Sequence, residues 1–385
     1  MNPMLFPKNT LRHDQGMPRR LSTAPDRTWV EIDRSVLRHN LKAIRKLAGK
    51  AGIMAVVKAN AYGHGLEEVA RVLAGGVEVF AVASLGEAIQ LRKVLKRVPI
   101  LLLSAALPAE YREIARQGFI PTLSSIEEAR LFARSAPKEA PVHFKVDTGM
   151  GRLGALPHEA LTILKAILKA GLQVQSISTH LSSADSDVKT TRRQLATFAD
   201  LLEELQQLAP KAAIHALNSA GTMLHASEEG DLVRIGLALY GVSPLPSFQK
   251  LLRPVLSWKA RITFLNDIPK GHRVSYGGTF TAPRAMKVAV LPAGYADGYP
   301  RQVSGKGAEV LIRGKHCPVI GRVTMDQIMI DVSKIRGVKV GDEAVLVGKQ
   351  GREELTATEV AAKADTIPWH LFCGITGRVA YRYKG

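Results

Sequence analysis

The 385-residue sequence predicts an α/β fold, a (β/α)₈ TIM-type barrel followed by a C-terminal mainly-β domain. Eight short apolar runs alternate with helix-like segments, which favours a closed parallel barrel over an open doubly wound sheet. The pattern changes after Arg253-Pro254, where short strand-like runs follow one another with Gly- and Pro-containing turns between them. We therefore expect the barrel over residues 28–254 and the β-rich domain over residues 255–385.

The barrel begins with a helix whose apolar residues recur at helical spacing. These residues are Val36, Leu37, Leu41, Ile44 and Leu47. The eight apolar runs that follow are 53–57, 79–82, 100–103, 120–123, 142–146, 174–178, 214–217 and 232–235. Helix-like segments between them include 84–95, 125–133, 157–169 and 191–208. An extra strand over 28–32 precedes the first helix, and we expect it to pair with the β-rich domain.

The second domain consists of short strand candidates and one helix-like stretch over residues 356–364. The strand candidates are 258–265, 286–291, 309–312, 328–332 and 344–347. Residues 1–27 contain Pro and Arg without periodicity and are predicted to be a disordered extension, within which Met17 is an alternative start. The extension lacks the apolar segment of a secretory signal.

Composition excludes several classes of protein. The net charge of +19 comes from basic residues spread along the chain, and only 5% of residues are aromatic, so nucleic-acid binding is not favoured. No apolar run approaches the roughly 20 residues of a membrane span. Cys317 and Cys373 form no disulfide framework and suit a reducing cytoplasm. We expect a cytoplasmic protein that acts on a small molecule.

Polar residues lie at or just after the ends of the apolar runs, where a barrel carries its reactive groups. They are Lys58, Lys145, Asp147, Thr179, His180, Asn218, Ser219 and Arg234. Each one alone is typical of an ordinary strand end, but together they form a polar cup at one rim. Ser219 and Gly236 follow runs seven and eight, where barrels commonly bind phosphate. A Schiff-base lysine beside a phosphate site points to pyridoxal 5′-phosphate (PLP).

Residues 56–65 read VVKANAYGHG, which closely resembles the PLP attachment motif of alanine racemases. Further stretches are similar to the same family: VDTGMGRLG at 146–154, Asn218-Ser219, VRIGLALYG at 233–241, VSYG at 274–277, GYADGYPR at 294–301 and GRVTMDQ at 321–327. The resemblance covers nearly everything after residue 27. It implies a homodimeric alanine racemase that supplies D-alanine for peptidoglycan.

The resemblance also implies a role for each matching residue. Lys58 binds PLP covalently and serves as one proton-transfer base, and Tyr276 is the opposite base, reaching the cofactor from the other subunit. Arg152 faces the cofactor and the substrate carboxylate, which also meets the backbone amide of Met325 from the partner. Arg234 faces the pyridine nitrogen. The other implied cofactor-binding residues are Tyr62, His180, Ser219, Gly236 and Leu237; no metal is implied.

Racemisation removes the α-proton on one face and returns a proton on the other, so two bases on opposite faces suffice. A tyrosine, with a reference pKa near 10, needs cationic neighbours to act as a base at neutral pH. An arginine at the pyridine nitrogen cannot accept its proton. That arrangement weakens PLP as an electron sink and limits side reactions such as transamination.

Two positions bear on substrate and modification. Gly377 stands where some members place a tyrosine near the phosphate and the inner entrance, so side chains larger than methyl become candidates. Lys145 matches a lysine that some members carry as a carbamate. The alternatives are a broader-specificity racemase acting on serine or lysine and a non-catalytic PLP-binding protein. A related basic-amino-acid decarboxylase would lack Tyr276 and the motif at 294–299.

Overall fold

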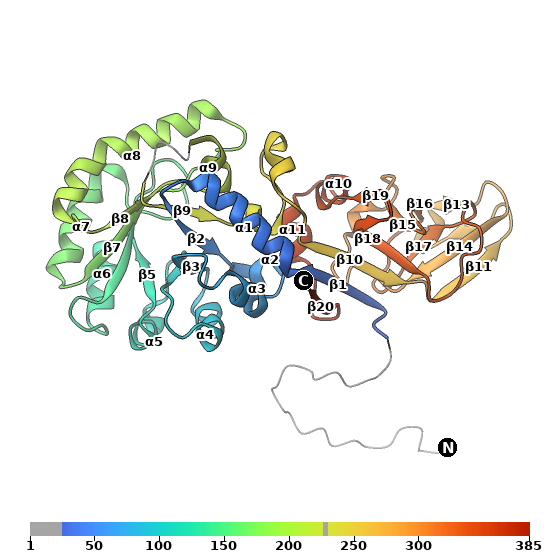
Figure 1. Cartoon of the computed structure of the whole chain (residues 1–385), viewed down its shortest axis with the longest axis horizontal. Coiled ribbons are helices and arrows are strands. Elements are labelled where there is room, and N and C mark those ends of the chain that lie inside the picture. The colour runs from blue at the N-terminus through green and yellow to red at the C-terminus, as the bar shows by residue number, and fades with distance from the viewer. Residues whose placement is uncertain (1–24, 226–229) are drawn as a thin grey trace, which may run out of the picture.

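The computed structural model describes residues 25–225 and 230–385. Most of the predicted N-terminal extension, with Met17, lies outside these residues. The chain forms an elongated molecule with a barrel at one end and a β domain at the other (Figure 1). The first and last strands lie side by side at the junction, because β1 pairs with β20.

Eight parallel strands form the barrel sheet in the order β8-β7-β6-β5-β4-β3-β2-β9. Their bounds are β2 (Gly52–Val56), β3 (Val79–Val82), β4 (Ile100–Leu102), β5 (Ile120–Leu123), β6 (Pro141–Lys145), β7 (Gln173–Ser178), β8 (Ala213–His215) and β9 (Leu232–Ile235). Two backbone hydrogen bonds join the ends of this order, Asp231 N–H to Ile214 O (2.8 Å) and Arg234 N–H to Leu217 O (2.9 Å). The predicted barrel is therefore confirmed, and each strand overlaps one predicted apolar run.

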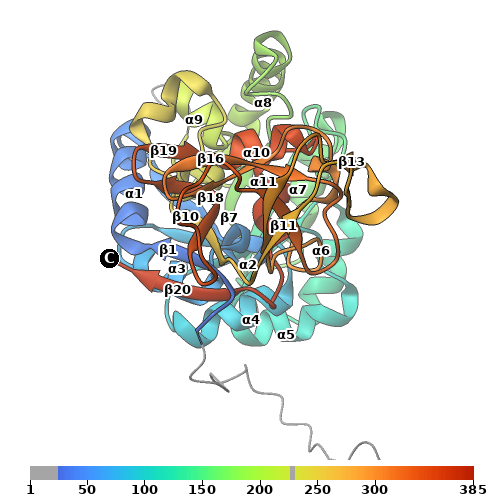
Figure 2. The ribbon, with the colours of Figure 1, turned by 90° about the vertical axis from the view of Figure 1, so that its right-hand side faces the viewer.

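Helices surround the barrel sheet as a ring (Figure 2). The helices of this domain are α1 (Arg34–Ala48), α3 (Leu66–Leu73), α4 (Leu85–Val94), α5 (Tyr111–Gln117), α6 (Ile126–Ala133), α7 (Ala160–Lys169), α8 (Val188–Leu208) and α9 (Ser219–His225). The short segment α2 (Lys58–Gly63) is not part of the ring and follows the carboxyl end of β2. In α1 the side chain of Asp33 caps the helix by accepting from the N–H groups of Ser35 and Val36. Its apolar stripe is buried against the sheet at Leu37 and Ile44.

The β domain is built on a large sheet with the order β11-β14-β17-β16-β15-β18-β10-β1-β20. The strands are β1 (Thr28–Asp33), β10 (Leu256–Arg261), β11 (Phe264–Ile268), β14 (Met286–Leu291), β15 (Glu309–Ile312), β16 (Lys315–Ile320), β17 (Ile328–Asp331), β18 (Glu343–Gln350), β19 (Glu353–Leu355) and β20 (Ala380–Lys384), with β12 (Arg273–Val274) and β13 (Phe280–Thr281) as a separate pair. Strand β1 lies antiparallel to β10. The segment over 28–32 thus belongs to the sheet of the β domain although it precedes the barrel in sequence.

Several details of the β domain differ from the sequence-based expectation, which did not include strands β12, β13, β16, β19 and β20. The single strand expected over 258–265 is wrong: β10 and β11 are separate, because the backbone changes partners at Ile262, which donates to Asp342 O, and Thr263, which donates to Val290 O. The helix expected over 356–364 is α10 (Ala357–Lys363), capped by Thr356 and Glu359. A further helix, α11 (Pro368–Cys373), was not predicted, because six residues are too few for a periodic pattern.

No helix in the described part of the chain has both the length and the apolar character that crossing a membrane requires.

Candidate active site

A cavity of about 740 Å³ lies at the carboxyl ends of the barrel strands. Every barrel residue predicted to bind cofactor or substrate lines this cavity, namely Lys58, Tyr62, Arg152, His180, Ser219, Arg234, Gly236 and Leu237. Lys145, the last residue of β6, also lies on the wall. Helix α11 contributes Trp369 and Cys373, which the sequence did not single out because α11 itself was not predicted. The cavity thus brings residues from five barrel strands and their loops together with one element of the β domain.

Lys58 follows β2 after one intervening residue, Val57, whose N–H donates to Ala81 O of β3 (2.9 Å). The lysine is therefore fixed to the rim through the barrel sheet itself. Burial, and then the nearby guanidinium of Arg152, lower the pKa of Lys58. A lowered pKa raises the fraction of neutral amine, which is the form that attacks a carbonyl carbon.

The four residues after Lys58 form a left-handed turn. Ala59, Asn60, Ala61 and Tyr62 have φ angles of 52°, 53°, 54° and 53°, with ψ between 44° and 54°. Left-handed helical backbone is unfavourable by roughly 1–2 kcal/mol for each residue other than glycine. Strain of this kind persists only where the surroundings hold it in place. The turn brings Lys58 and Tyr62 onto the wall of the same cavity.

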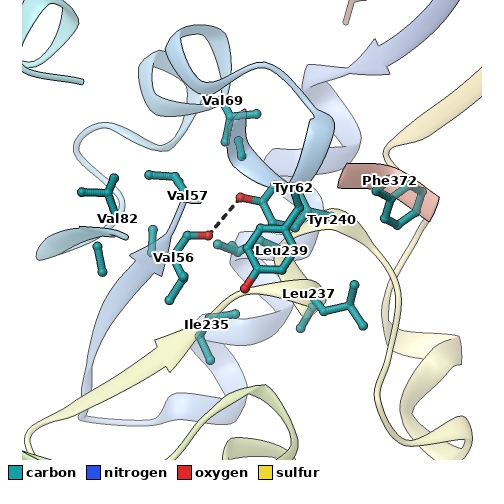
Figure 3. Packing of buried hydrophobic residues seen from close by; sticks show 14 of the residues in the cluster. Val56, Val57, Tyr62, Val69, Val82, Ile235, Leu237, Leu239, Tyr240 and Phe372 are labelled. Carbon is teal, nitrogen blue, oxygen red and sulfur yellow. Dashed lines mark hydrogen bonds between the residues drawn. The ribbon is translucent and has the colours of Figure 1, made fainter. Parts of the chain in front are cut away.

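Buried aromatic rings support this turn (Figure 3). The Tyr240 hydroxyl donates to Val56 O at the end of β2 (3.0 Å), and the Tyr240 ring lies 5.0 Å from the Tyr62 ring and 4.5 Å from the His64 ring. The carbonyl of Phe372 in α11 approaches Gly63 so closely that a Cβ there would lie 2.1 Å from its oxygen. The β domain therefore packs directly against the lysine turn of the barrel.

One end of the cavity is suited to a phosphate group. Ser219 opens α9, and its hydroxyl accepts from the N–H of Gly236 (3.2 Å). A Cβ at Gly236 would come within 2.7 Å of the Tyr62 hydroxyl, so this position requires glycine. Burial raises the pKa of Tyr62 to about 12, which keeps its hydroxyl protonated and able to donate to an anion. Leu237 begins the short 3₁₀ helix Leu237–Tyr240 beside this group.

Arg234 in β9 is buried and held by five contacts. One terminal nitrogen contacts His215 Nδ1 (2.5 Å) and donates to His215 O (2.8 Å). The other donates to Thr179 O and Ala216 O (both 2.7 Å) and lies 3.3 Å from His180 Nδ1. Within residues 25–225 and 230–385 no acceptor meets Nε, which leaves this donor for a group in the cavity. Burial lowers the pKa of Arg234 to about 10, so the guanidinium stays charged at neutral pH.

Neutral histidines surround this arginine. Burial and the charge of Arg234 lower the pKa of His143 to about 3 and that of His180 to about 2, and they hold the pKa of His215 far below its usual range. His143 contacts the hydroxyls of Ser176 (2.7 Å) and Ser178 (2.9 Å), and its ring stacks 4.9 Å from that of His215. His143 was not predicted, although its spacing of two from Lys145 on one strand indicates a shared face.

The loop that carries Arg152 is fixed by one carboxylate. Asp147 accepts from the backbone N–H groups of Gly149 (2.9 Å), Met150 (2.7 Å) and Arg152 (3.0 Å). Burial, then Arg234 and Arg152, lower the pKa of Lys145 to about 8. Arg152 and Lys145 thus form a cationic side of the cavity that is suited to a carboxylate or another anion.

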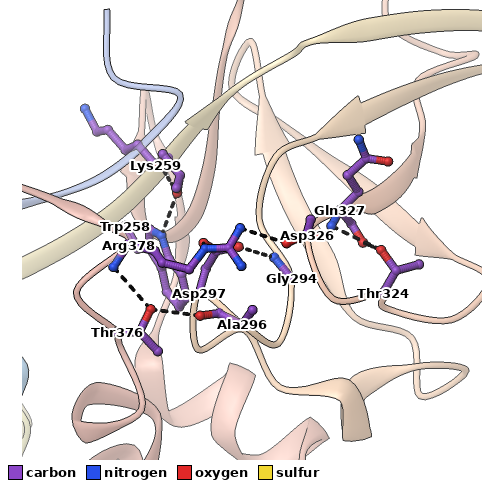
Figure 4. A network of polar contacts seen from close by, with 11 residues as sticks. Trp258, Lys259, Gly294, Ala296, Asp297, Thr324, Asp326, Gln327, Thr376 and Arg378 are labelled. Atoms are coloured by element: carbon purple, nitrogen blue, oxygen red, sulfur yellow. Dashed lines mark hydrogen bonds and ion pairs between the residues drawn. The ribbon is translucent and has the colours of Figure 1, made fainter. Parts of the chain in front are cut away.

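Tyr276 and Met325 lie in the β domain and are not on the wall of this cavity. As residues they are 69% and 51% exposed, which is high for large hydrophobic residues. The loop that bears Met325 is well supported: Arg378 pairs with Asp326 (2.7 Å) and Asp297 (3.2 Å) (Figure 4). The structure therefore brings together the barrel residues of the predicted site, and it leaves the two β-domain residues on the surface.

The described residues contain no group of three or more His, Cys, Asp or Glu side chains arranged to hold a metal ion. The fold and the site define an α/β-barrel protein whose cavity combines a lysine of lowered pKa, a charged arginine and an end suited to an anion.

Comparison with known proteins narrows this class. The alanine racemase N-terminal domain family matches residues 32–244, and the alanine racemase C-terminal domain family matches residues 255–383. The chain belongs to the alanine racemase family. It is 43% identical over 367 residues to an alanine racemase of Halothermothrix orenii, covering 93% of this chain and 97% of the relative. An alanine racemase of Symbiobacterium thermophilum is 42% identical, with coverage of 93% and 97%.

Solved structures agree with this assignment. The alanine racemase from D-cycloserine-producing Streptomyces lavendulae has a TM-score of 0.87 and 35% identity, with 94% of this chain and 98% of that chain covered. The alanine racemase of Clostridium difficile 630 has a TM-score of 0.87 and 33% identity, with coverage of 94% and 96%. Both the barrel and the β domain are therefore shared with the solved racemases.

Proposed function

We propose that the protein is a PLP-dependent alanine racemase that interconverts L- and D-alanine with two bases, one on each face of the substrate. The observation that carries the proposal is the single cavity that unites the Lys58 amine, the free Nε–H of Arg234 and the hydroxyls of Tyr62 and Ser219. An amine, a cation and an anion-binding end are the groups that a phosphorylated pyridine aldehyde requires.

The residues present fit PLP. Lys58 would hold its aldehyde carbon, and Tyr62, Ser219 and the backbone N–H groups of Gly236 and Leu237 would hold its phosphate. The glycine at 236 leaves space that a Cβ would fill against the Tyr62 hydroxyl, 2.7 Å away. Arg234 would donate its unpaired Nε–H to the ring nitrogen. His180, kept neutral by burial and Arg234, lines the same wall without adding charge.

When bound, PLP withdraws electrons from the α-carbon of an attached amino acid and thereby acidifies its α-hydrogen. Arg234 has no acceptor and keeps its proton, so it does not pass a proton to the ring nitrogen. Five contacts hold the Arg234 guanidinium in one position. The guanidinium therefore cannot move closer to negative charge that would develop on the pyridine ring. Arg152 binds and orients the substrate carboxylate.

The proton transfers need one base on each face. Lys58 holds or releases a proton at Nζ on one face, and burial and Arg152, which lower its pKa, favour release of that proton. Tyr276 is exposed on its own chain, so we propose that Tyr276 of a second copy supplies the opposite face, with the backbone N–H of Met325 of that copy at the substrate carboxylate. The active species is then a homodimer whose sites are shared.

The decisive experiment incubates the purified protein and PLP with L-alanine and measures D-alanine by chiral chromatography. Formation of D-alanine that stops after hydroxylamine treatment and returns with added PLP is expected. A visible cofactor band without exchange of the α-hydrogen in D₂O would instead indicate a non-catalytic PLP-binding protein. The unpaired cysteines Cys317 and Cys373 support a reducing cytoplasm as the compartment, where D-alanine would serve peptidoglycan synthesis.

One observation favours a broader substrate range as the second candidate. Gly377 is exposed and does not line the cavity of its own chain, and a Cβ built there would meet no atom within 4 Å, so no side chain narrows the surface at this position. Turnover of serine or lysine at a rate comparable to alanine would support the broader racemase. In that case Gly377→Tyr is expected to reduce turnover of the larger substrates while that of alanine changes little.

A further inference from the structure

The left-handed turn after Lys58 is tied to the neighbouring strand by one carboxylate. Glu87, in the first turn of α4, accepts from the backbone N–H of Ala59 through Oε1 (2.7 Å) and from that of Ala83 through Oε2 (2.7 Å). Ala59 is the first left-handed residue, and Ala83 directly follows β3. Both oxygens of Glu87 therefore connect the lysine turn to the end of the next barrel strand.

A second helix of the barrel begins with the same motif but lacks this connection. Ser84 caps α4 and Ser125 caps α6, and each is followed three residues later by a glutamate. In α6 Glu128 accepts from the backbone N–H of Ser124 (2.7 Å) and from the Ser125 hydroxyl (3.2 Å). Those contacts stay within the start of one helix, which is the usual use of a glutamate in this position.

The direct contact of Glu87 is with the backbone of the turn, while its charge, from a distance, opposes the lowering of the Lys58 pKa by burial and Arg152. Among the residues described, no ion pair joins Glu87 to Lys58, and Ala59 N–H donates to Glu87 alone. The bond meets the turn at Ala59, where the backbone changes to positive φ, one residue after Lys58. The position of the lysine side chain on the rim depends on that change of direction.

We propose that Glu87 is a positioning residue for Lys58: it holds the left-handed turn and so keeps the lysine directed into the cavity. The consequence for catalysis rests on the proposed function, but the consequence for the backbone does not. Sequence alone gives little warning of this role, since Ser84-Leu-Gly-Glu87 also satisfies an ordinary helix start.

The test uses Glu87→Gln and Glu87→Ala, with Glu128→Gln and Glu128→Ala as matched controls, all in the full-length holoenzyme. A glutamine can accept only through its one carbonyl oxygen, so it loses one of the two backbone bonds. We expect amide hydrogen exchange in the peptide over residues 58–66 to rise about tenfold in the Glu87 variants. In the Glu128 variants, exchange in that peptide is expected to match that of wild type. The melting temperature of the Glu128 variants is expected to fall about as much as that of the Glu87 variants.

Activity and rescue provide independent readouts. We expect kcat to fall on the order of 10- to 100-fold in the Glu87 variants, with a smaller change in KM, because a small displacement of a catalytic group has this effect. Glycine adopts positive φ without strain. Ala59→Gly introduced into Glu87→Gln is therefore expected to restore much of the protection and of kcat, whereas Ala59→Gly alone changes little.

The outcomes separate the inference from the proposed function. If wild type neither binds PLP nor racemises alanine, the proposed function fails, while the exchange data still test the turn. Equal exchange and equal kcat in the Glu87 and Glu128 pairs would overturn the inference, as would a loss that Ala59→Gly does not reduce. If Glu87→Ala does not fold, Glu87→Gln, which keeps the side-chain volume, decides the matter.

Discussion

The two predicted bases sit in opposite environments. Lys58 lies on the wall of a cavity, attached to the barrel sheet through Val57 and surrounded by cationic and aromatic neighbours. Tyr276 lies in a short 3₁₀ turn of the β domain with 69% of its side chain exposed. Under the proposed function, one chain would therefore provide the lysine base from its interior and the tyrosine base from its surface.

Both regions nevertheless use a positive φ beside the base. Ala59 follows Lys58 with φ 52°, and Ser275 precedes Tyr276 with φ 65°. In the barrel the turn is held by buried rings and by Glu87, whereas Ser275 is held by its hydroxyl, which donates to Arg322 O (2.7 Å). Each predicted base therefore lies beside a locally strained backbone, but the lysine turn is supported by buried groups, whereas the Tyr276 turn is supported by exposed ones, Ser275 and Arg273.

The largest effect is expected for Lys58→Ala, which removes the covalent attachment and one base together. We expect a loss of at least about 1,000-fold in racemisation, because a positioned base alone contributes on the order of 10²- to 10⁴-fold. The visible absorbance of bound PLP should also disappear. Melting temperature is expected to change by only a few degrees, and retained absorbance in this variant would contradict the assignment of Lys58.

The next effect is expected for Tyr276→Phe, which tests the exposed half. Removing one hydroxyl should lower racemisation on the order of 10²- to 10³-fold, while PLP absorbance and melting temperature stay at wild-type values because the phenyl ring and Lys58 are both kept. In D₂O the variant should still exchange the α-hydrogen of one enantiomer through Lys58. Exchange that remains equal for both enantiomers would contradict the two-base division.

The barrel could be predicted from sequence because its eight strands are short apolar runs that alternate with helix-like segments and carry polar residues at their ends. The left-handed turn could not be predicted, since Ala-Asn-Ala-Tyr has no composition that demands positive φ. Its supports come from Glu87 and Tyr240, far along the chain. The surface position of Tyr276 was implied only by family resemblance, because a sequence carries no direct sign of a second copy.

Mixing two inactive variants tests whether the halves belong to different chains. Co-expression of Lys58→Ala with Tyr276→Phe should produce mixed dimers in which one site has both bases and the other has neither. About one quarter of wild-type activity is expected, because half of the dimers are mixed and each mixed dimer holds one intact site. Tandem purification through two different tags isolates the mixed dimers, which should show half of wild-type activity. No recovery in the isolated mixed dimers would mean that each chain completes its own site.

The smallest effect concerns stability in acid and arises in the barrel half alone. Burial and then Arg234 lower the pKa of His143 to about 3, so this ring is neutral in the folded protein below pH 6.5, where the unfolded chain takes up a proton. The unfolded state therefore binds more protons, and the free energy of unfolding falls as the pH drops from about 6.5 towards 3.

One such histidine contributes a slope of about 1.4 kcal/mol per pH unit within this window. His143→Asn, which keeps a polar group between Ser176 and Ser178, should reduce the slope by the share of one proton. Denaturant unfolding of both proteins between pH 4 and pH 6 measures the difference. An unchanged slope in His143→Asn would mean that the buried ring does not stay neutral in the folded protein. The buried barrel site and the exposed β-domain face would then not differ in how protonation affects stability.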